Sequence, residues 1–135
     1  MSQENVEIVR RVTEVMDAEG FEAALPVFLE AAHPDVEWRE DPAWPGSADY
    51  RGLEQVREVI RDRMDTLDFD QQTEDLIDVG DKVVALVRWI GRGKASGAQG
   101  EMSMAMVWTI RDERIARLEF FLDRAEALAA AELRE

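Results

Sequence analysis

Apolar residues recur every three or four positions in the first half of the chain, which is the spacing of one helix face. The pattern predicts helices over residues 3–19, 21–32 and 53–67. Between the second and third helices, the alternation of residues 36–40 predicts a strand. Residues 41–51 contain two prolines and a glycine, and we expect a loop there.

The period of the apolar pattern changes to two after residue 70. Four segments alternate in this way, and they predict strands over residues 71–80, 82–93, 101–112 and 114–123. The segments "GD" and "RDER" between them are short enough for hairpin turns, so we expect antiparallel neighbours. The alanine-rich end, residues 124–135, predicts a final helix.

Helices followed by strands are typical of an α+β fold, and 135 residues make one domain, residues 1–135. One sheet must then cover the apolar stripes of three helices. A strongly curved sheet that wraps these helices would leave a cavity at its open end.

Both faces of the later strands carry apolar residues. In the strand over residues 82–93, Val84, Leu86 and Ile90 alternate with Val87 and Trp89. Helices on one side of a sheet cannot bury both faces. We therefore expect a homodimer that forms through the outer face of the sheet.

Composition and charge exclude several classes of function. With 30 acidic and 16 basic residues, the net charge of −14 has the wrong sign for binding nucleic acid or an anionic membrane surface. There is no cysteine and only one histidine, which excludes thiol catalysis and a histidine-based metal site. No apolar run approaches the ~18 residues that span a bilayer. We expect a cytoplasmic protein with no cofactor, no metal and no nucleic-acid or membrane partner.

Five segments carry a family resemblance: "HPDVEW", "YRGLEQVRE", "LIDVGDKVVALVR", "VWTIRDERI" and "LDRAEAL". With the order of the elements, they resemble the SnoaL-like group of the nuclear-transport-factor-2-like (NTF2-like) superfamily over essentially the whole chain. The resemblance implies a cone-shaped, usually dimeric α+β domain. Three N-terminal helices would pack in a strongly curved mixed or antiparallel sheet, with a short C-terminal helix. Members include polyketide cyclases, ketosteroid isomerases, dehydratases, epoxide hydrolases and proteins without known activity, so the fold does not fix the function.

The resemblance marks three carboxylates as candidate proton-transfer groups. An ungapped match to the first strand of the ketosteroid isomerases puts Glu40 at the position of their base, and a match to their "EDP" puts Asp41 there. A carboxylate beside Trp38 in an apolar mouth would suit a general base; the alternative is a solvent-facing strand end where Asp41 starts a turn. Asp123 matches a late-strand acid/base of the SnoaL-like cyclases, or it caps the last helix together with Glu126.

Other groups that these reactions use have no counterpart in the sequence. The two oxyanion-hole positions of the ketosteroid isomerases fall at Val12 and Met106. Losing such a donor removes about 3 kcal/mol of transition-state stabilisation, which disfavours steroid isomerisation. The paired cavity histidine of the SnoaL-like cyclases is also missing, because the strand reads "AMVWT".

The resemblance further indicates which side chains face the inside of the cone. They are large, aromatic or flexible, which suits a small hydrophobic ligand, although the same side chains would also serve as core. Trp44 and Tyr50 belong to the loop over the mouth, where they either cover a ligand or anchor the loop. The candidate ligand-binding residues are Trp38, Trp44, Tyr50, Trp89, Met104, Met106, Trp108, Leu118, Phe120 and Leu122.

Two functions remain open at this point. The first is a non-catalytic, dimeric module that binds a small hydrophobic molecule, and the missing donors favour it. The alternative is a cofactor-independent enzyme of isomerase, cyclase, dehydratase or hydrolase type, with Glu40 or Asp41 as the base. An isolated buried carboxylate facing an open cavity would favour the enzyme, whereas a cone filled by its own tryptophans would favour the binding module.

Overall fold

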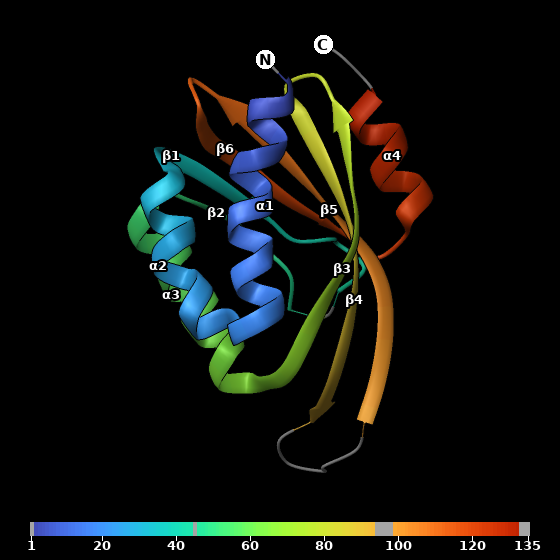
Figure 1. Ribbon diagram of the computed structural model, residues 1–135. Helices are drawn as coiled ribbons and strands as arrows, with labels where there is room; N and C mark the ends of the chain where they lie inside the picture. The colour runs from blue at the N-terminus through green and yellow to red at the C-terminus, as the bar shows by residue number, and fades with distance from the viewer. Residues whose placement is uncertain (1, 45, 94–98, 133–135) are drawn as a thin grey trace.

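The computed structural model describes residues 2–44, 46–93 and 99–132. Within these residues, four helices and six strands follow one another in the predicted order, with one short strand added (Figure 1). The elements are α1 (Ser2–Glu19), α2 (Phe21–Ala31), β1 (Ala32–Arg39), β2 (Asp49–Arg51), α3 (Leu53–Thr66), β3 (Leu67–Val79), β4 (Lys82–Gly93), β5 (Gln99–Arg111), β6 (Arg114–Phe121) and α4 (Arg124–Glu132).

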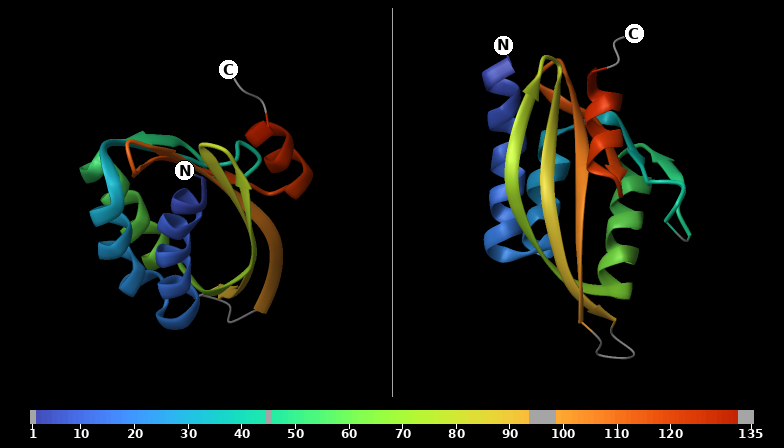
Figure 2. Two further views of the ribbon diagram at one scale, coloured as in Figure 1. Left: turned by 45° about the horizontal axis from the view of Figure 1, so that its top comes forward. Right: turned by 90° about the vertical axis from the view of Figure 1, so that its right-hand side faces the viewer.

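The six strands form one mixed sheet in the order β2–β1–β6–β5–β4–β3. β1 and β6 are parallel, and every other neighbouring pair is antiparallel. A register shift between Thr73 and Asp75 bends β3 locally, and a second shift, where Thr109 pairs with Arg117 and Ile110 with Ile115, bends β6. Figure 2 shows α1, α2 and α3 on the concave side of the curved sheet and α4 on the opposite side. The α+β cone expected from the sequence is thus present.

The main core lies between the concave face of the sheet and the first three helices. Val83 and Val87 of β4 and Met104 and Trp108 of β5 face this core, and all four are 0% exposed. From the helical side, the predicted apolar stripes supply buried residues such as Val12. Burying a side chain of this size stabilises the fold by about 1.5–3 kcal/mol, so the alternating pattern fixes which face of each strand points inward.

α4 covers part of the convex face of the sheet. Ala127 and Ala131 lie one turn apart on this helix and pack against Val84, Ala105 and Val107 of β4 and β5. The expectation that helices cover only one face of the sheet is therefore wrong. Val84 is buried by the chain's own last helix and needs no second subunit to cover it.

Two boundaries near the predicted site differ from the expectation. The loop predicted over residues 41–51 contains β2, whose residues pair with β1 so that Tyr50 lies opposite Trp38. β1 begins at Ala32, four residues earlier than predicted, because Ala32 pairs with Ile115 of β6. It also ends at Arg39, so Glu40 follows the strand instead of closing it.

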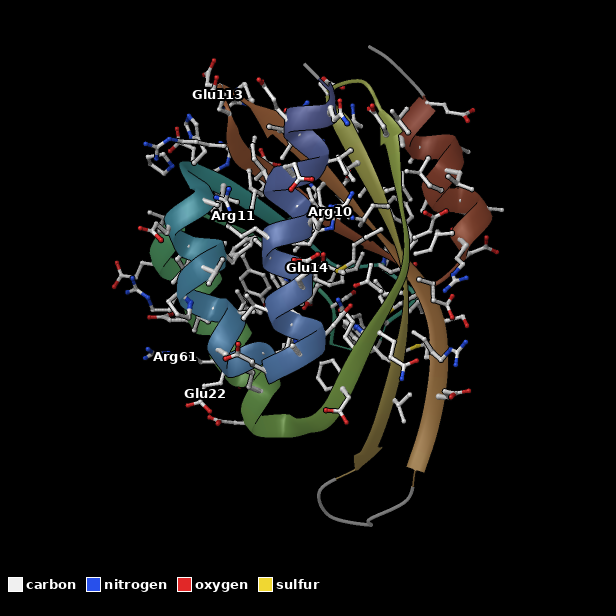
Figure 3. The ribbon with its side chains drawn as sticks, in the orientation of Figure 1. Arg10, Arg11, Glu14, Glu22, Arg61 and Glu113 are labelled. Carbon is white, nitrogen blue, oxygen red and sulfur yellow. The ribbon has the colours of Figure 1, made fainter. Side chains whose placement is uncertain are left out.

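Both predicted tight turns are present. The turn between β3 and β4 has Gly80 at φ 75°, and the turn between β5 and β6 has Asp112 and Glu113 at φ 55° and 64°. In the turn between β5 and β6, positive φ at both central residues matches the twist of the flanking strands. Side chains with a Cβ adopt this conformation only at a cost. Figure 3 places Glu113 at the outer tip of this hairpin.

Among the described residues, no helix is long and apolar enough to cross a membrane.

Candidate functional site

A cavity of about 60 Å³ lies inside the cone, between the first three helices and the concave face of the sheet. An apolar cavity of ~150 Å³ in a protein core binds benzene, and this one is less than half that size. The cone is therefore filled largely by its own side chains. Seven of the predicted ligand-binding residues line what remains, namely Trp38, Trp44, Trp89, Met106, Trp108, Leu118 and Phe120.

The structure places the other three predicted residues outside this cavity wall. Tyr50 lies on the edge strand β2, on the far side of β1 from the cavity. Met104 is fully buried opposite Val87, in the core next to the cavity. Leu122 follows β6, and its backbone N–H donates to Asp41 Oδ2 at 2.8 Å. The sequence predicts which face of each strand points inward. Which of these inward side chains border the cavity depends on how they pack in three dimensions.

Phe69 of β3 and a set of helical residues complete the wall, and none of them was predicted as a ligand contact. The resemblance marked strand faces only, whereas the helices contribute through the apolar stripes that predicted their existence. The helical residues are Val12 and Met16 of α1, Phe21, Ala24, Leu25 and Phe28 of α2, and Ile60, Arg63 and Met64 of α3.

Aromatic rings close the cavity on the side of the loop that follows β1. The Trp44 ring packs edge-on against Trp89, with ring centres 5.7 Å apart, and against Phe120 at 6.3 Å. The ring of Trp38, on β1, also packs against Phe120, with ring centres 4.6 Å apart. Trp44 therefore anchors the loop on the core and forms part of the cavity wall. Its other predicted role, covering a ligand, stays a prediction.

The Glu40 carboxylate also belongs to the wall, and its side chain is only 1% exposed. Its Oε1 accepts from Arg63 Nη2 at 2.6 Å and from the Ala48 N–H at 3.2 Å. Its Oε2 accepts from Arg63 Nε at 2.9 Å and from Trp38 Nε1 at 3.1 Å. The hydrogen bond and the charge of Glu40 raise the pKa of Arg63. A carboxylate has about four lone-pair sites, so the described partners occupy all of them.

The two other candidate acids have structural contacts away from the cavity. Asp41 Oδ1 accepts from the Ala43 N–H at 2.9 Å, and its Oδ2 accepts from Leu122, so it ties the loop after β1 to the end of β6. Asp123 Oδ1 accepts from the Glu126 N–H at 3.1 Å. This contact is the helix cap that the sequence offered as the alternative role of Asp123.

Charged residues on the other face of β1 form a separate cluster. Glu37 Oε1 lies 3.0 Å from Arg39 Nη2 and 3.3 Å from Arg117 Nε, and Arg51 hydrogen bonds to the second oxygen. Burial would raise the pKa of Glu37, but the hydrogen bond from Arg51 and the charges of Arg117, Arg39 and Arg51 together lower it. Because adjacent strand residues point to opposite faces, this cluster has no contact with the cavity.

The model of the SnoaL-like domain family matches residues 9–118, most of the chain. The chain belongs to the SnoaL-like family. Among solved structures, this SnoaL-like chain is similar to an NTF2-like protein of Burkholderia thailandensis E264, with 25% identity over 96% of this chain and 97% of that one and a TM-score of 0.76. An NTF2-like protein of Burkholderia xenovorans LB400 is 21% identical over 98% of both chains, also with a TM-score of 0.76.

A third similar structure is that of TerC crystallised with polyporic acid. It is 19% identical, covers 96% of this chain and 99% of that one, and has a TM-score of 0.75. No curated protein matches the sequence. These likenesses show that the SnoaL-like chain has the NTF2-like fold. They do not identify its activity, which must be inferred from the residues of the site.

The described part of this SnoaL-like protein has no candidate metal centre. No group of three or more histidine, aspartate or glutamate side chains in these residues lies close enough together to hold a metal ion. The Glu40–Arg63 pair is the charged part of the described cavity wall, and the remaining wall residues are apolar or aromatic.

Three tryptophans on strands of this SnoaL-like cone differ in their hydrogen bonds. Trp38 Nε1 donates to Glu40, and Trp89 Nε1 donates to Gln71 Oε1 at 2.8 Å. Trp108 Nε1 has no partner among the described residues, although Trp108 is 0% exposed. Leaving a buried donor unpaired costs about 1–3 kcal/mol, and most buried polar groups are paired. The cavity wall thus includes a tryptophan with an unused donor.

Proposed function

We propose that this SnoaL-like protein is a non-catalytic module that binds a small hydrophobic molecule inside its cone. The observation that carries the proposal is the state of Glu40, the carboxylate of an otherwise apolar wall. A general base needs a lone pair directed at the substrate's proton. Arg63, Trp38 and Ala48 already take the lone pairs of Glu40. TerC, which has the same fold, was crystallised with the small molecule polyporic acid, which supports the idea that such a cone can hold a guest.

The size of the cavity limits the guest. About 60 Å³ is room for only a few heavy atoms. Trp44 lies in the loop after β1 and is only partly buried, so its ring is the part of the wall that a larger guest would displace. We propose that small neutral molecules enter the cone as it stands and that larger ones enter with movement of Trp44.

The intrinsic fluorescence of the protein tests this proposal. All four tryptophans of the chain line the cavity, so a bound guest should change their emission. Cyclic ketones and hydrocarbons of increasing ring size would be titrated. Met106→Ala enlarges the cavity and should strengthen binding of the larger rings.

Val107→Ala is the matched control for this experiment. Val107 is the next residue of β5 and is equally buried, but it packs under α4 on the opposite face. It should therefore lower stability without changing the affinity for any ring. If Met106→Ala and Val107→Ala both bind every probe as the wild type does, the cavity is not the binding site and the proposal is wrong.

We also propose that the module is a homodimer through the outer sheet face. α4 covers Val84, but Leu86 and Ile90 on the same face of β4 stay half-buried. Arg88 and Glu101 lie beside them, so the interface would be partly polar. Light scattering at micromolar concentration should give a particle of twice the chain's 15.4 kDa, and a particle of 15.4 kDa would exclude the dimer.

One observation favours the second candidate, a cofactor-independent enzyme that acts by proton transfer. Glu40 lines the cavity, so its carboxylate borders any guest there. If Glu40 acts as a base, the protein should exchange the α-protons of a bound cyclic ketone for deuterium in heavy water, and Glu40→Gln should abolish that exchange. The binding module predicts no exchange above the rate in buffer.

A further inference from the structure

We infer that the indole N–H of Trp108 recognises the guest, and that the guest is a neutral molecule whose polar atom is a hydrogen-bond acceptor, such as a ketone or ether oxygen. The inference rests on the proposed function, because it specifies the chemistry of the molecule that the cone binds.

The first step is the unused donor. Trp108 lines the cavity and is 0% exposed, and its Nε1 has no partner among the described residues. Trp89 lines the same cavity but is committed to Gln71, and Trp38 is committed to Glu40. An indole nitrogen only donates, so what satisfies Trp108 must be an acceptor.

The second step is the charge and polarity of the acceptor. Arg63 is the cation of the described wall, and its guanidinium already donates two hydrogen bonds to Glu40. An anionic guest would therefore be desolvated without a free counter-charge. In the described lining, the side-chain oxygens are those of Glu40, and these already accept from four donors. A hydroxyl would bring a donor that finds no free acceptor, so the wall favours a carbonyl or ether oxygen.

The third step is the rigidity of the donor. In the sheet, Trp108 lies opposite Val83 of β4 and Leu118 of β6. The ring of Phe28 packs against it from α2, with ring centres 6.1 Å apart. Neighbours on both strands and on the helix hold the indole in place. Because the indole is already held in place, binding a guest costs little side-chain entropy, and more of the hydrogen-bond energy contributes to affinity.

The test compares two guests of nearly the same shape, cyclopentanone and methylenecyclopentane, of which only the ketone has an acceptor. Both are larger than the cavity as it stands, so they would enter with the movement of Trp44 proposed above. Trp108→Phe keeps an aromatic ring and removes the N–H. The substitution should weaken cyclopentanone binding by about 3- to 10-fold, the range for one neutral hydrogen bond. Methylenecyclopentane should change by less than about twofold, within the error of such a cycle.

Trp89→Phe is the matched control, because it removes an N–H that is already paired with Gln71. It should affect both guests equally. If neither guest binds to the wild type, the proposed binding function fails, and this inference fails with it. If both guests bind and Trp108→Phe weakens them equally, the cone still binds small molecules, and only the role of the indole is overturned.

A measurement on the wild type keeps the inference testable if Trp108→Phe does not fold. The indole ¹H–¹⁵N resonance of Trp108 can be assigned by elimination, from spectra of Trp38→Phe, Trp44→Phe and Trp89→Phe. It should move downfield when cyclopentanone binds and stay in place when methylenecyclopentane binds. Equal shifts with both guests would overturn the inference.

Discussion

Replacing Arg63 by methionine should destabilise the protein by about 3 kcal/mol, the lower end of the range for breaking a buried ion pair. Methionine keeps much of the length of the side chain and removes the guanidinium. The substitution leaves Glu40 with two of its four hydrogen bonds, those from Trp38 and Ala48, at 1% side-chain exposure.

The magnitude follows from the geometry of the pair. Arg63 makes two hydrogen bonds to Glu40, at 2.6 and 2.9 Å, and bonds to charged groups contribute about 1.5–3 kcal/mol each. The Arg63 side chain is 25% exposed, so water can replace part of what is lost. For this reason we expect about 3 kcal/mol, not the full sum.

Urea denaturation at neutral pH measures the effect. With a slope of about 2 kcal/mol per molar urea, the midpoint should fall by about 1.5 M. Arg61→Met is the matched control on the same helix, because Arg61 is exposed and projects away from the cone (Figure 3). Its stability should stay within about 0.5 kcal/mol of the wild type.

A double-variant cycle shows whether the loss comes from this ion pair. Glu40→Gln alone should also destabilise the protein, because an amide cannot accept from all four donors. Each single variant leaves one charge buried without its partner, whereas the double variant Glu40→Gln with Arg63→Met leaves none. The double variant should therefore lose at least about 2 kcal/mol less unfolding free energy than the two single variants added together. The reasoning is refuted if Arg63→Met unfolds within about 0.5 kcal/mol of the wild type, or if the two losses simply add.

Three further predictions concern other parts of the fold. The pKa of Glu37 is lowered, so its contribution to stability is present above its unfolded pKa of about 4.3 and is lost as the pH falls through the folded value. In urea titrations, the loss of unfolding free energy caused by Glu37→Gln should therefore shrink below about pH 4.3, and a loss independent of pH would contradict this. Glu113→Gly should raise stability by about 0.5–1 kcal/mol by removing a Cβ at φ 64°, seen as a higher melting temperature, whereas an unchanged or lower one would mean that the turn is not strained. Asp123→Ala should cost about 1 kcal/mol through the lost cap of α4, and Asp123→Asn should restore most of it.

The fold follows closely from the sequence because its signals are local and repeated. The apolar stripes of the helices and the alternation in β4 and β5 predict both the elements and their buried faces. β2 escapes this reasoning, since Asp49–Arg51 is short and polar and becomes a strand only by pairing with β1. α4 was predicted as a helix, but its position on the convex face depends on how Ala127 and Ala131 fit against the sheet.

The candidate site was only partly predictable. The position of Glu40 near the cone mouth could be inferred from the resemblance, but its partner Arg63 is 23 residues away on another element. The available hint was weak: Arg63 lies three residues after Ile60 and so borders the apolar stripe of α3. The free indole N–H of Trp108 has no sequence signal at all, because whether a buried donor is paired depends on every neighbour in three dimensions.

The central claim is that the cone holds an apolar space open to a small neutral guest, and xenon tests it most directly. Apolar cavities in proteins stay dry and bind xenon, whereas polar ones hold ordered water. The structure predicts that a crystal under xenon pressure shows the gas within the cavity of about 60 Å³, among Met106, Trp108 and Phe120. A crystal with no xenon there, or with ordered water filling that space in its place, would contradict the account.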